Sequence, residues 1–255
     1  MSVPVVNLRS RGVRLLVLAL LAAVVVLAAR HVPGLARSAN AGVVDRRTLW
    51  GVPNALDVLS NLPFALAGAL GLLRLGRVAR AQRPAAALVF TAVVLVTFCS
   101  SWYHLAPSRE RLLLDRVPIT LAFVALFAWV LGDRLGARVG QLALLPLLAV
   151  GAAALWRWHA TGELFGYVLV QALPFALIPC LLVLFEGELR PARFAWALVF
   201  YGAGKLCELY DRELFELGRL ASGHTLKHLL SAAACFALLP SRARAPTELP
   251  SLERA

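Results

Sequence analysis

The chain lacks the short motifs that mark several common enzyme classes. It contains no glycine-rich phosphate loop, no HExxH zinc-peptidase motif and no GxSxG nucleophile elbow. Its four cysteines are far apart and form no CxxC pair, so buried packing is a better interpretation than a cysteine zinc site. Lysine is also nearly absent beside many arginines and alanines, which is typical of a GC-rich bacterial genome.

Apolar sequence, by contrast, is abundant. Hydrophobic residues make up 60% of the 255 residues, and the mean hydropathy is +0.75. A water-soluble fold of this size needs far less, so the composition predicts an all-α polytopic membrane protein, in a bacterium an inner-membrane one. The net charge of +12 does not indicate nucleic-acid binding, because the arginines flank apolar runs as juxtamembrane anchors do. These clusters are Arg9/Arg11/Arg14, Arg74/Arg77/Arg80/Arg83, Arg190/Arg193 and Arg242/Arg244.

Eight apolar runs are long enough to be candidate membrane-spanning helices. They cover residues 13–29, 56–75, 86–105, 113–132, 138–156, 164–185, 193–210 and 223–239. We expect residues 1–49 to form an N-terminal anchor helix and loop, 50–240 a seven-helix core, and 241–255 a disordered cytoplasmic tail. The first run could instead be a signal peptide, but it is long for one, and a retained anchor is favoured. The arginine distribution modestly favours a cytoplasmic N-terminus.

Histidines mark one end of this predicted bundle. His224 and His228 lie one turn apart on the last helix and can reach one metal ion. His104 ends the third run, with Ser100 on the same helical face, and Asp115 begins the fourth. Four crossings separate the start of the fourth run from the start of the eighth. The span count therefore predicts that all these groups lie at one membrane face.

Three imidazoles with an open fourth position are typical of a catalytic zinc site. In this hypothesis His104, His224 and His228 bind Zn²⁺. Asp115 accepts a proton from the bound water or orients a ligand, and Ser100 donates a hydrogen bond to a developing oxyanion. Each residue has another interpretation. The histidine pair could bind haem or neighbouring helices, and His104 could be an interfacial side chain. Asp115 could pair with Arg116, and Ser100 could bond back to its own helix.

These residues resemble the alkaline ceramidase family and its superfamily of seven-helix membrane hydrolases, which includes the progestin and adiponectin receptors. The resemblance covers about residues 50–240. It rests on Leu59-Ser60-Asn61-Leu62, Ser100-x-x-x-His104, Asp115 eleven residues later, and His224-x-x-x-His228. It implies a seven-helix core, so the first run would be an N-terminal addition.

By this resemblance the three histidines hold zinc, Asp115 and Ser100 support the water and the oxyanion, and the reaction is hydrolysis of a ceramide-like lipid amide. The resemblance does not extend to the family's calcium site. Here only Asp45, Asn54 and Asp57 offer oxygens, and Arg46/Arg47 oppose a cation.

Two alternatives remain beside a hydrolase: a receptor-like protein of the same superfamily that binds lipid without turnover, and a haem-binding electron carrier. A transporter is a weaker third.

The acidic segment 207–216 is more typical of a solvated loop than of a lid or a cation site. Lys205 is expected to snorkel, and Lys227 to meet lipid headgroups on another face than the histidines. The oligomeric state is not indicated.

Overall fold

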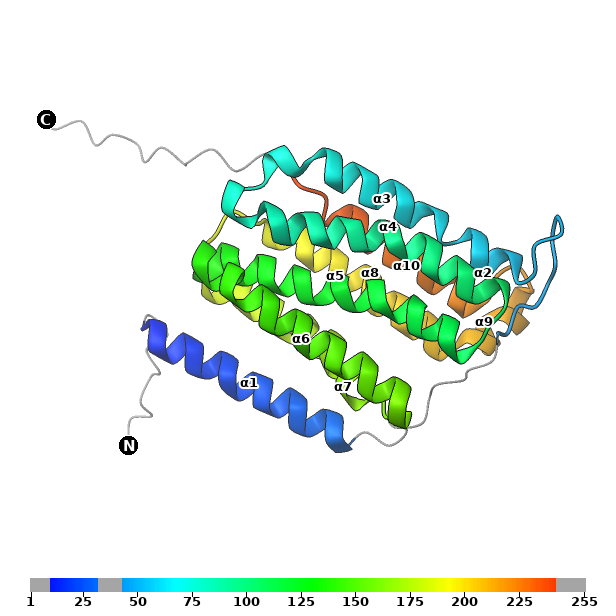
Figure 1. The fold of residues 1–255 in the computed structure, drawn as a ribbon, viewed down its shortest axis with the longest axis horizontal. Helices are drawn as coiled ribbons and strands as arrows, with labels where there is room; N and C mark the ends of the chain where they lie inside the picture. The colour runs from blue at the N-terminus through cyan, green and yellow to red at the C-terminus, as the bar shows by residue number, and fades with distance from the viewer. Residues whose placement is uncertain (1–9, 32–42, 242–255) are drawn as a thin grey trace, which may run out of the picture.

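The computed structural model describes residues 10–31 and 43–241, and in these ranges the chain is an all-α bundle (Figure 1). Its one β feature there is an isolated bridge between Leu49 and Val52. The helices are α1 (Arg11–His31), α2 (Ala55–Leu59), α3 (Leu62–Leu73), α4 (Arg83–Leu105), α5 (Arg109–Leu135), α6 (Ala137–Thr161), α7 (Phe165–Leu184), α8 (Pro191–Leu209), α9 (Asp211–Gly218) and α10 (Gly223–Ala237). Two 3₁₀ turns, Leu75–Arg77 and Arg80–Gln82, join α3 to α4. The predicted tail lies almost wholly outside the described residues.

Six helical segments are long and apolar enough to cross a membrane, as a multi-pass membrane protein requires. They are α1, α2 with α3, and α4 to α7. All eight predicted runs are helical, but the last two, α8 and α10, are not among these six segments. The α8 helix carries Arg193, Lys205 and Glu208. The α10 helix has 15 residues, and at 1.5 Å per residue it is about 22 Å long, shorter than the roughly 30 Å hydrocarbon core.

The second predicted run is not one continuous helix. It breaks between α2 and α3 at Ser60 and Asn61, because Pro63 has no N–H to donate and its ring would clash with the carbonyl of Leu59. Both polar side chains at the break are buried. Ser60 Oγ and Asn61 Nδ2 donate to the backbone oxygen of Asp57 at 3.1 and 2.9 Å. The break therefore places two polar side chains inside the bundle, although Asn61 Oδ1 has no hydrogen-bond partner within the described ranges.

The segment between α8 and α10 also differs from expectation. It contains the short helix α9 where a solvated loop was predicted. The α9 helix lies at the end of the bundle where α2 begins (Figure 1). Leu217 and Leu220 are 87% and 82% exposed beside charged residues of the same segment, and this amphipathic pattern is typical of helices that lie in a membrane interface.

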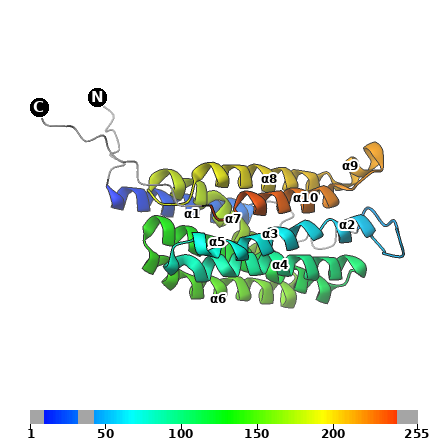
Figure 2. The ribbon, with the colours of Figure 1, turned by 90° about the horizontal axis from the view of Figure 1, so that it is seen from above.

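The last helix closes the bundle by returning to its beginning. Successive helices from α3 to α6 pack side by side, whereas α10 packs against α8 and also contacts α2 and α3. In Figure 2, α8 and α9 run along one side of the bundle and α6 along the other. The N-terminal α1 lies outside, against α7, where Arg14 donates to the backbone oxygen of Leu184 at 2.7 Å.

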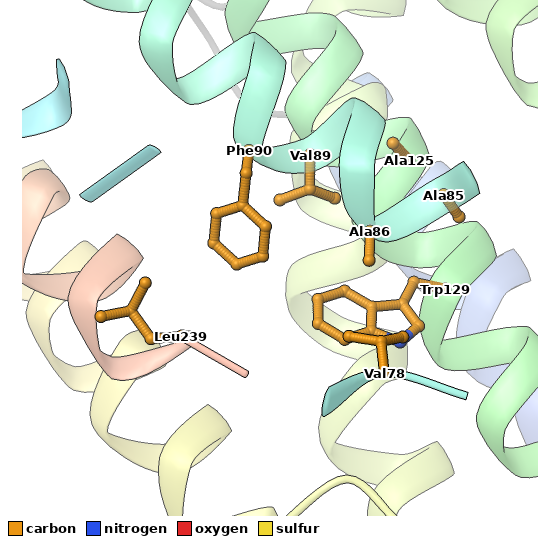
Figure 3. Close-up of a cluster of buried hydrophobic side chains, with 8 residues drawn as sticks. All are labelled: Val78, Ala85, Ala86, Val89, Phe90, Ala125, Trp129 and Leu239. Carbon is orange, nitrogen blue, oxygen red and sulfur yellow. The ribbon is translucent and has the colours of Figure 1, made fainter. Parts of the chain in front are cut away.

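Apolar packing at the opposite end from α9 holds α4, α5 and α10 together (Figure 3). Phe90 of α4 meets Trp129 of α5 edge to face at 6.2 Å, an arrangement that suits the ring quadrupoles. Leu239, just after α10, belongs to the same cluster. This cluster anchors the far ends of the helices whose near ends carry the histidines.

Candidate metal centre

Three histidines converge at the end of the bundle where α4 ends and α10 begins. His104 lies in the last turn of α4, and His224 and His228 lie in the first turns of α10. One ring nitrogen from each lies within 4.8 Å of the others. The Nε2 atoms of His104 and His224 are 3.2 Å apart. The structure thus brings together the three histidines that the sequence placed on one membrane face.

The Nδ1 atoms of the imidazoles have different surroundings: that of His228 has a hydrogen-bond partner, whereas that of His104 is buried without one within the described ranges. Ser60 Oγ lies 2.9 Å from Nδ1 of His228. Carboxylate oxygens of Asp57 and Glu208 lie 4.0 and 3.9 Å from Nδ1 of His104 and His224. Histidines that bind metals through one ring nitrogen commonly hold the other against a carboxylate, a carbonyl or another oxygen. The Nε2 atoms of His104 and His224 face each other, and Lys227 Nζ lies 3.1 Å from that of His224.

The distance between two of these nitrogens suits a tetrahedral zinc ion. With Zn–N bonds of about 2.05 Å, two ligands of a tetrahedral site lie about 3.3 Å apart, close to the 3.2 Å between His104 and His224. The cluster is also shielded, because His104 and His228 are buried and the His224 side chain is 23% exposed. Three histidine ligands leave a fourth position open for water or substrate.

Asp57 is a site residue that the sequence reasoning treated only as a candidate calcium ligand. Its side chain is buried, and Oδ1 accepts hydrogen bonds from Thr225 Oγ1 at 2.6 Å and Ser222 Oγ at 3.3 Å. Ser222 in turn caps α10 by accepting from the Thr225 N–H. Asp57 therefore ties α2 to the start of α10 while facing His104. The sequence did carry a signal for Asp57 as a site residue, namely a carboxylate inside an apolar run, three residues before Ser60.

The two predicted catalytic residues interact with each other near the end of α4 that carries His104. Ser100 is buried one turn before His104 on α4. Asp115 interacts with Ser100 and with the charge of Lys227. Its Oδ1 atom is buried and has no hydrogen-bond partner within the described ranges. A buried carboxylate oxygen without a partner is costly, so it is available to a ligand or a water.

Two lysines share a carboxylate near the centre, and the sequence-based expectation for Lys227 was wrong. Lys227 Nζ lies 3.1 Å from Nε2 of His224 and 3.0 Å from Glu208 Oε1. Lys205 Nζ lies 2.9 Å from Glu208 Oε2. Lys227 does not meet headgroups because residues three apart are neighbours on a helix surface, and Glu208 of α8 attracts its ammonium. Glu208 holds Lys205 in the same way.

The loop before α2 packs onto this end of the bundle. Asn54 adopts a left-handed conformation and donates to the backbone oxygen of His104 at 2.7 Å. The two carboxylate oxygens of Asp45 accept from Arg47 at 2.8 and 2.6 Å, which lowers the pKa of Asp45. Arg47 also donates to the backbone of Arg219 at 2.7 Å. These contacts engage two of the three oxygen-bearing side chains considered for calcium.

Comparison of the chain with protein-family models, with curated proteins and with solved structures gives no match. The chemistry of the centre therefore rests on its own residues. Three inward-facing imidazoles can hold a divalent cation. Asp115, which interacts with Ser100 and Lys227, adds a carboxylate and a hydroxyl to this end of the bundle.

Proposed function

We propose that this protein is an integral membrane zinc hydrolase that cleaves the amide bond of a ceramide-like lipid, releasing a fatty acid and a long-chain amino alcohol. The observation that carries the proposal is the convergence of three imidazoles, with one ring nitrogen of each within 4.8 Å of the others. The order and spacing of Ser100, His104, Asp115 and the His224/His228 pair support it through their resemblance to alkaline ceramidases. We place the protein in a bacterial inner membrane.

The reaction adds the elements of water across the C–N bond. The acyl carbon gains a hydroxyl group, and the nitrogen leaves with the added proton. Zinc held by the three histidines lowers the pKa of water and polarises a carbonyl. Asp115 accepts a proton and can return it to the leaving nitrogen. Ser100 donates a hydrogen bond to the carbonyl oxygen as negative charge develops.

Three outer residues lie near the Nδ1 atoms. Ser60 is within hydrogen-bond distance of His228, and the carboxylates of Asp57 and Glu208 lie 4.0 and 3.9 Å from His104 and His224. In this proposal they favour the tautomer that presents Nε2 to the metal. The centre lies inside an apolar helical bundle, so an acyl chain can reach it sideways from the bilayer.

The geometry disfavours the haem alternative. A bis-histidine haem of an electron carrier needs its two axial ligands on opposite faces of a wide planar ring. Here the three imidazole rings lie against each other, with centroids 4.9 Å (His104–His224), 5.1 Å (His104–His228) and 4.7 Å (His224–His228) apart. No pair encloses a space for the macrocycle. A receptor-like lipid binder would use the same centre, so turnover must separate it from a hydrolase.

The test is metal content and product release from the same preparations. Detergent-purified wild type, prepared without chelators, is expected to hold about one zinc per chain and to release fatty acid from an N-acyl sphingosine with a labelled acyl chain. The His224→Ala/His228→Ala variant should lose both. His159→Ala is the matched control, because His159 is exposed at the end of α6 and away from the cluster. Wild type without zinc would overturn the proposal, and zinc without product release would favour the receptor-like alternative.

A further inference from the structure

Arginines gather at the end of the bundle opposite the histidines. The segments at this end contact one another: Arg11 of α1 donates to the backbone oxygen of Leu135 in α5 at 3.2 Å, and Arg193 of α8 donates to that of Leu239 after α10. The charged residues that the structure describes here are ten arginines and three acids, namely Arg11, Arg14, Arg74, Arg77, Arg80, Arg83, Arg134, Arg138, Arg190 and Arg193, with Asp133, Glu186 and Glu188. Such an excess of arginine is typical of the cytoplasmic side of a membrane protein.

A hollow lies at this end, beside the point where α10 stops. The α10 helix has 15 residues, whereas the neighbouring α8 has 19. The hollow is lined by the turns between α3 and α4, the end of α5, the start of α8 and the chain after α10. Its apolar lining includes Val78, Trp129 and Leu239 of the cluster in Figure 3, and its basic lining is Arg77, Arg190 and Arg193.

These three arginines have few partners within the protein. Among the described residues no carboxylate lies within ion-pair distance of any of them, and the side chains of Arg77 and Arg190 donate no hydrogen bond there. Arg193 is held by its bond to Leu239, and the like charges of Arg190 and Arg74 oppose its own. Each guanidinium therefore has N–H groups left for an anion.

Two acids also line the hollow, but they do not cancel its charge. Asp133 pairs with Arg134 at 3.0 Å and accepts from the backbone N–H of Glu188 at 3.1 Å. With this pair counted as neutral, three lining arginines remain against the one carboxylate of Glu188. Arg74 adds a further positive charge nearby. The wall of the hollow is therefore positive.

Apolar surface begins directly beside these arginines. Leu73 precedes Arg74 and is 82% exposed, and Trp196 follows Arg193 by about one turn of α8 and is 60% exposed. Exposed tryptophans and arginines at the ends of apolar helices are typical of the level of the lipid headgroups. A lipid presents its phosphate at this level and its acyl chains to such surfaces, whereas a soluble anion has no use for them. The surroundings therefore favour a lipid as the occupant of the hollow.

We propose that Arg77, Arg190 and Arg193 bind the phosphate of an anionic membrane lipid in this hollow, with its acyl chains along the adjoining apolar surface. Basic pockets between membrane helices are typical sites for anionic headgroups, and guanidinium groups bind phosphate through paired N–H donors. Arg77 lies in the turn after α3, and the other two lie at the start of α8. The bound lipid bridges these two segments and stabilises this end of the bundle. The inference goes beyond the proposed function, and its test needs no hydrolysis.

Lipid binding to the purified full chain can be counted by native mass spectrometry in a neutral detergent. The probes are dioleoyl phosphatidylglycerol, which is anionic, and dioleoyl phosphatidylcholine, which has the same acyl chains and no net charge. From an equimolar mixture the wild type should retain the anionic lipid about tenfold more, which corresponds to about 1.4 kcal/mol. The anionic lipid should also raise the midpoint of thermal unfolding, because a ligand of the folded state stabilises it.

Variants assign this preference to the hollow. Arg77→Gln/Arg190→Gln should bring the ratio of the two lipids close to one. Arg80→Gln/Arg138→Gln is the matched control, because it removes the same charge from the same end at two exposed arginines that do not line the hollow, and it should keep most of the ratio. Arg77 and Arg190 are also exposed, so both double variants should fold, which thermal unfolding checks. If the first does not fold, each single variant should still lower the ratio about threefold, which corresponds to about 0.65 kcal/mol.

Three results would overturn the inference. The first is equal retention of the two lipids by wild type. The second is an equal fall of the ratio in the two double variants, since the attraction would then belong to the whole basic surface. The third is displacement of the anionic lipid by an equal concentration of glycerophosphoglycerol, the same headgroup without acyl chains, because the ligand would then be a soluble phosphate.

Discussion

Asp57→Asn is the most informative single change at the candidate centre, because it alters charge with almost no change in volume. In the native chain Oδ1 accepts from Thr225 at 2.6 Å, and Oδ2 faces Nδ1 of His104 at 4.0 Å. An asparagine oxygen can keep the Thr225 bond. The amide NH₂ then faces Nδ1 and, as a donor, opposes the tautomer that presents Nε2 to a metal.

The expected effect is on metal binding rather than on folding. Loss of an outer partner of a metal-binding histidine typically weakens metal affinity about 10- to 100-fold, which corresponds to about 1.4 to 2.7 kcal/mol. The distance of 4.0 Å is longer than a hydrogen bond, so the lower part of this range is the more reasonable expectation. The volume is kept, so no cavity contributes to the loss.

Zinc affinity can be measured by competition with a chromophoric chelator in detergent, with thermal unfolding followed in parallel. Asp133→Asn is the matched control. Asp133 is also buried, but it pairs with Arg134 at the other end of the bundle, so its replacement should lower stability and leave zinc affinity unchanged. If Asp57→Asn binds zinc within twofold of wild type while remaining folded, then Asp57 does not orient His104 and the reasoning is wrong.

Three further predictions concern the framework around the centre. Gly223→Ala should lower stability by about 3 kcal/mol or more in thermal unfolding, because the new Cβ would lie 1.9 Å from the backbone oxygen of Cys207. Asn54→Ala should cost about 2 kcal/mol, roughly half from the left-handed backbone and half from the lost bond to His104; Asn54→Gly should recover the backbone part, and equal losses would contradict this division. Asp45 has a pKa lowered by its paired arginine, so its contribution is present above the unfolded value of about 3.9 and disappears as pH falls through the lower folded value. Asp45→Asn should therefore flatten the loss of unfolding stability below about pH 4, and an unchanged acid profile would show that the pair contributes nothing.

The positions of the helices follow from the sequence because a membrane requires long apolar runs, and such runs are easily read. The span count also placed His104, Asp115, His224 and His228 at one end of the bundle. The break at Ser60 was missed because Pro63 interrupts the helix without interrupting the apolar run. The α9 helix was missed because its amphipathic pattern covers only 8 residues.

By itself the sequence established the membrane class, the helix order and the set of histidines able to share a metal, since each depends on local composition or helical spacing. Only the tertiary structure showed what surrounds them. Asp57 and Ser60 come from a helix more than a hundred residues away from His224 and His228, and they meet because α10 returns to pack against α2 and α3. The direction of Lys227 was decided in the same way. Its place on a helix leaves open which neighbour it faces, and Glu208, brought to α10 by the packing of α8, holds its ammonium beside His224.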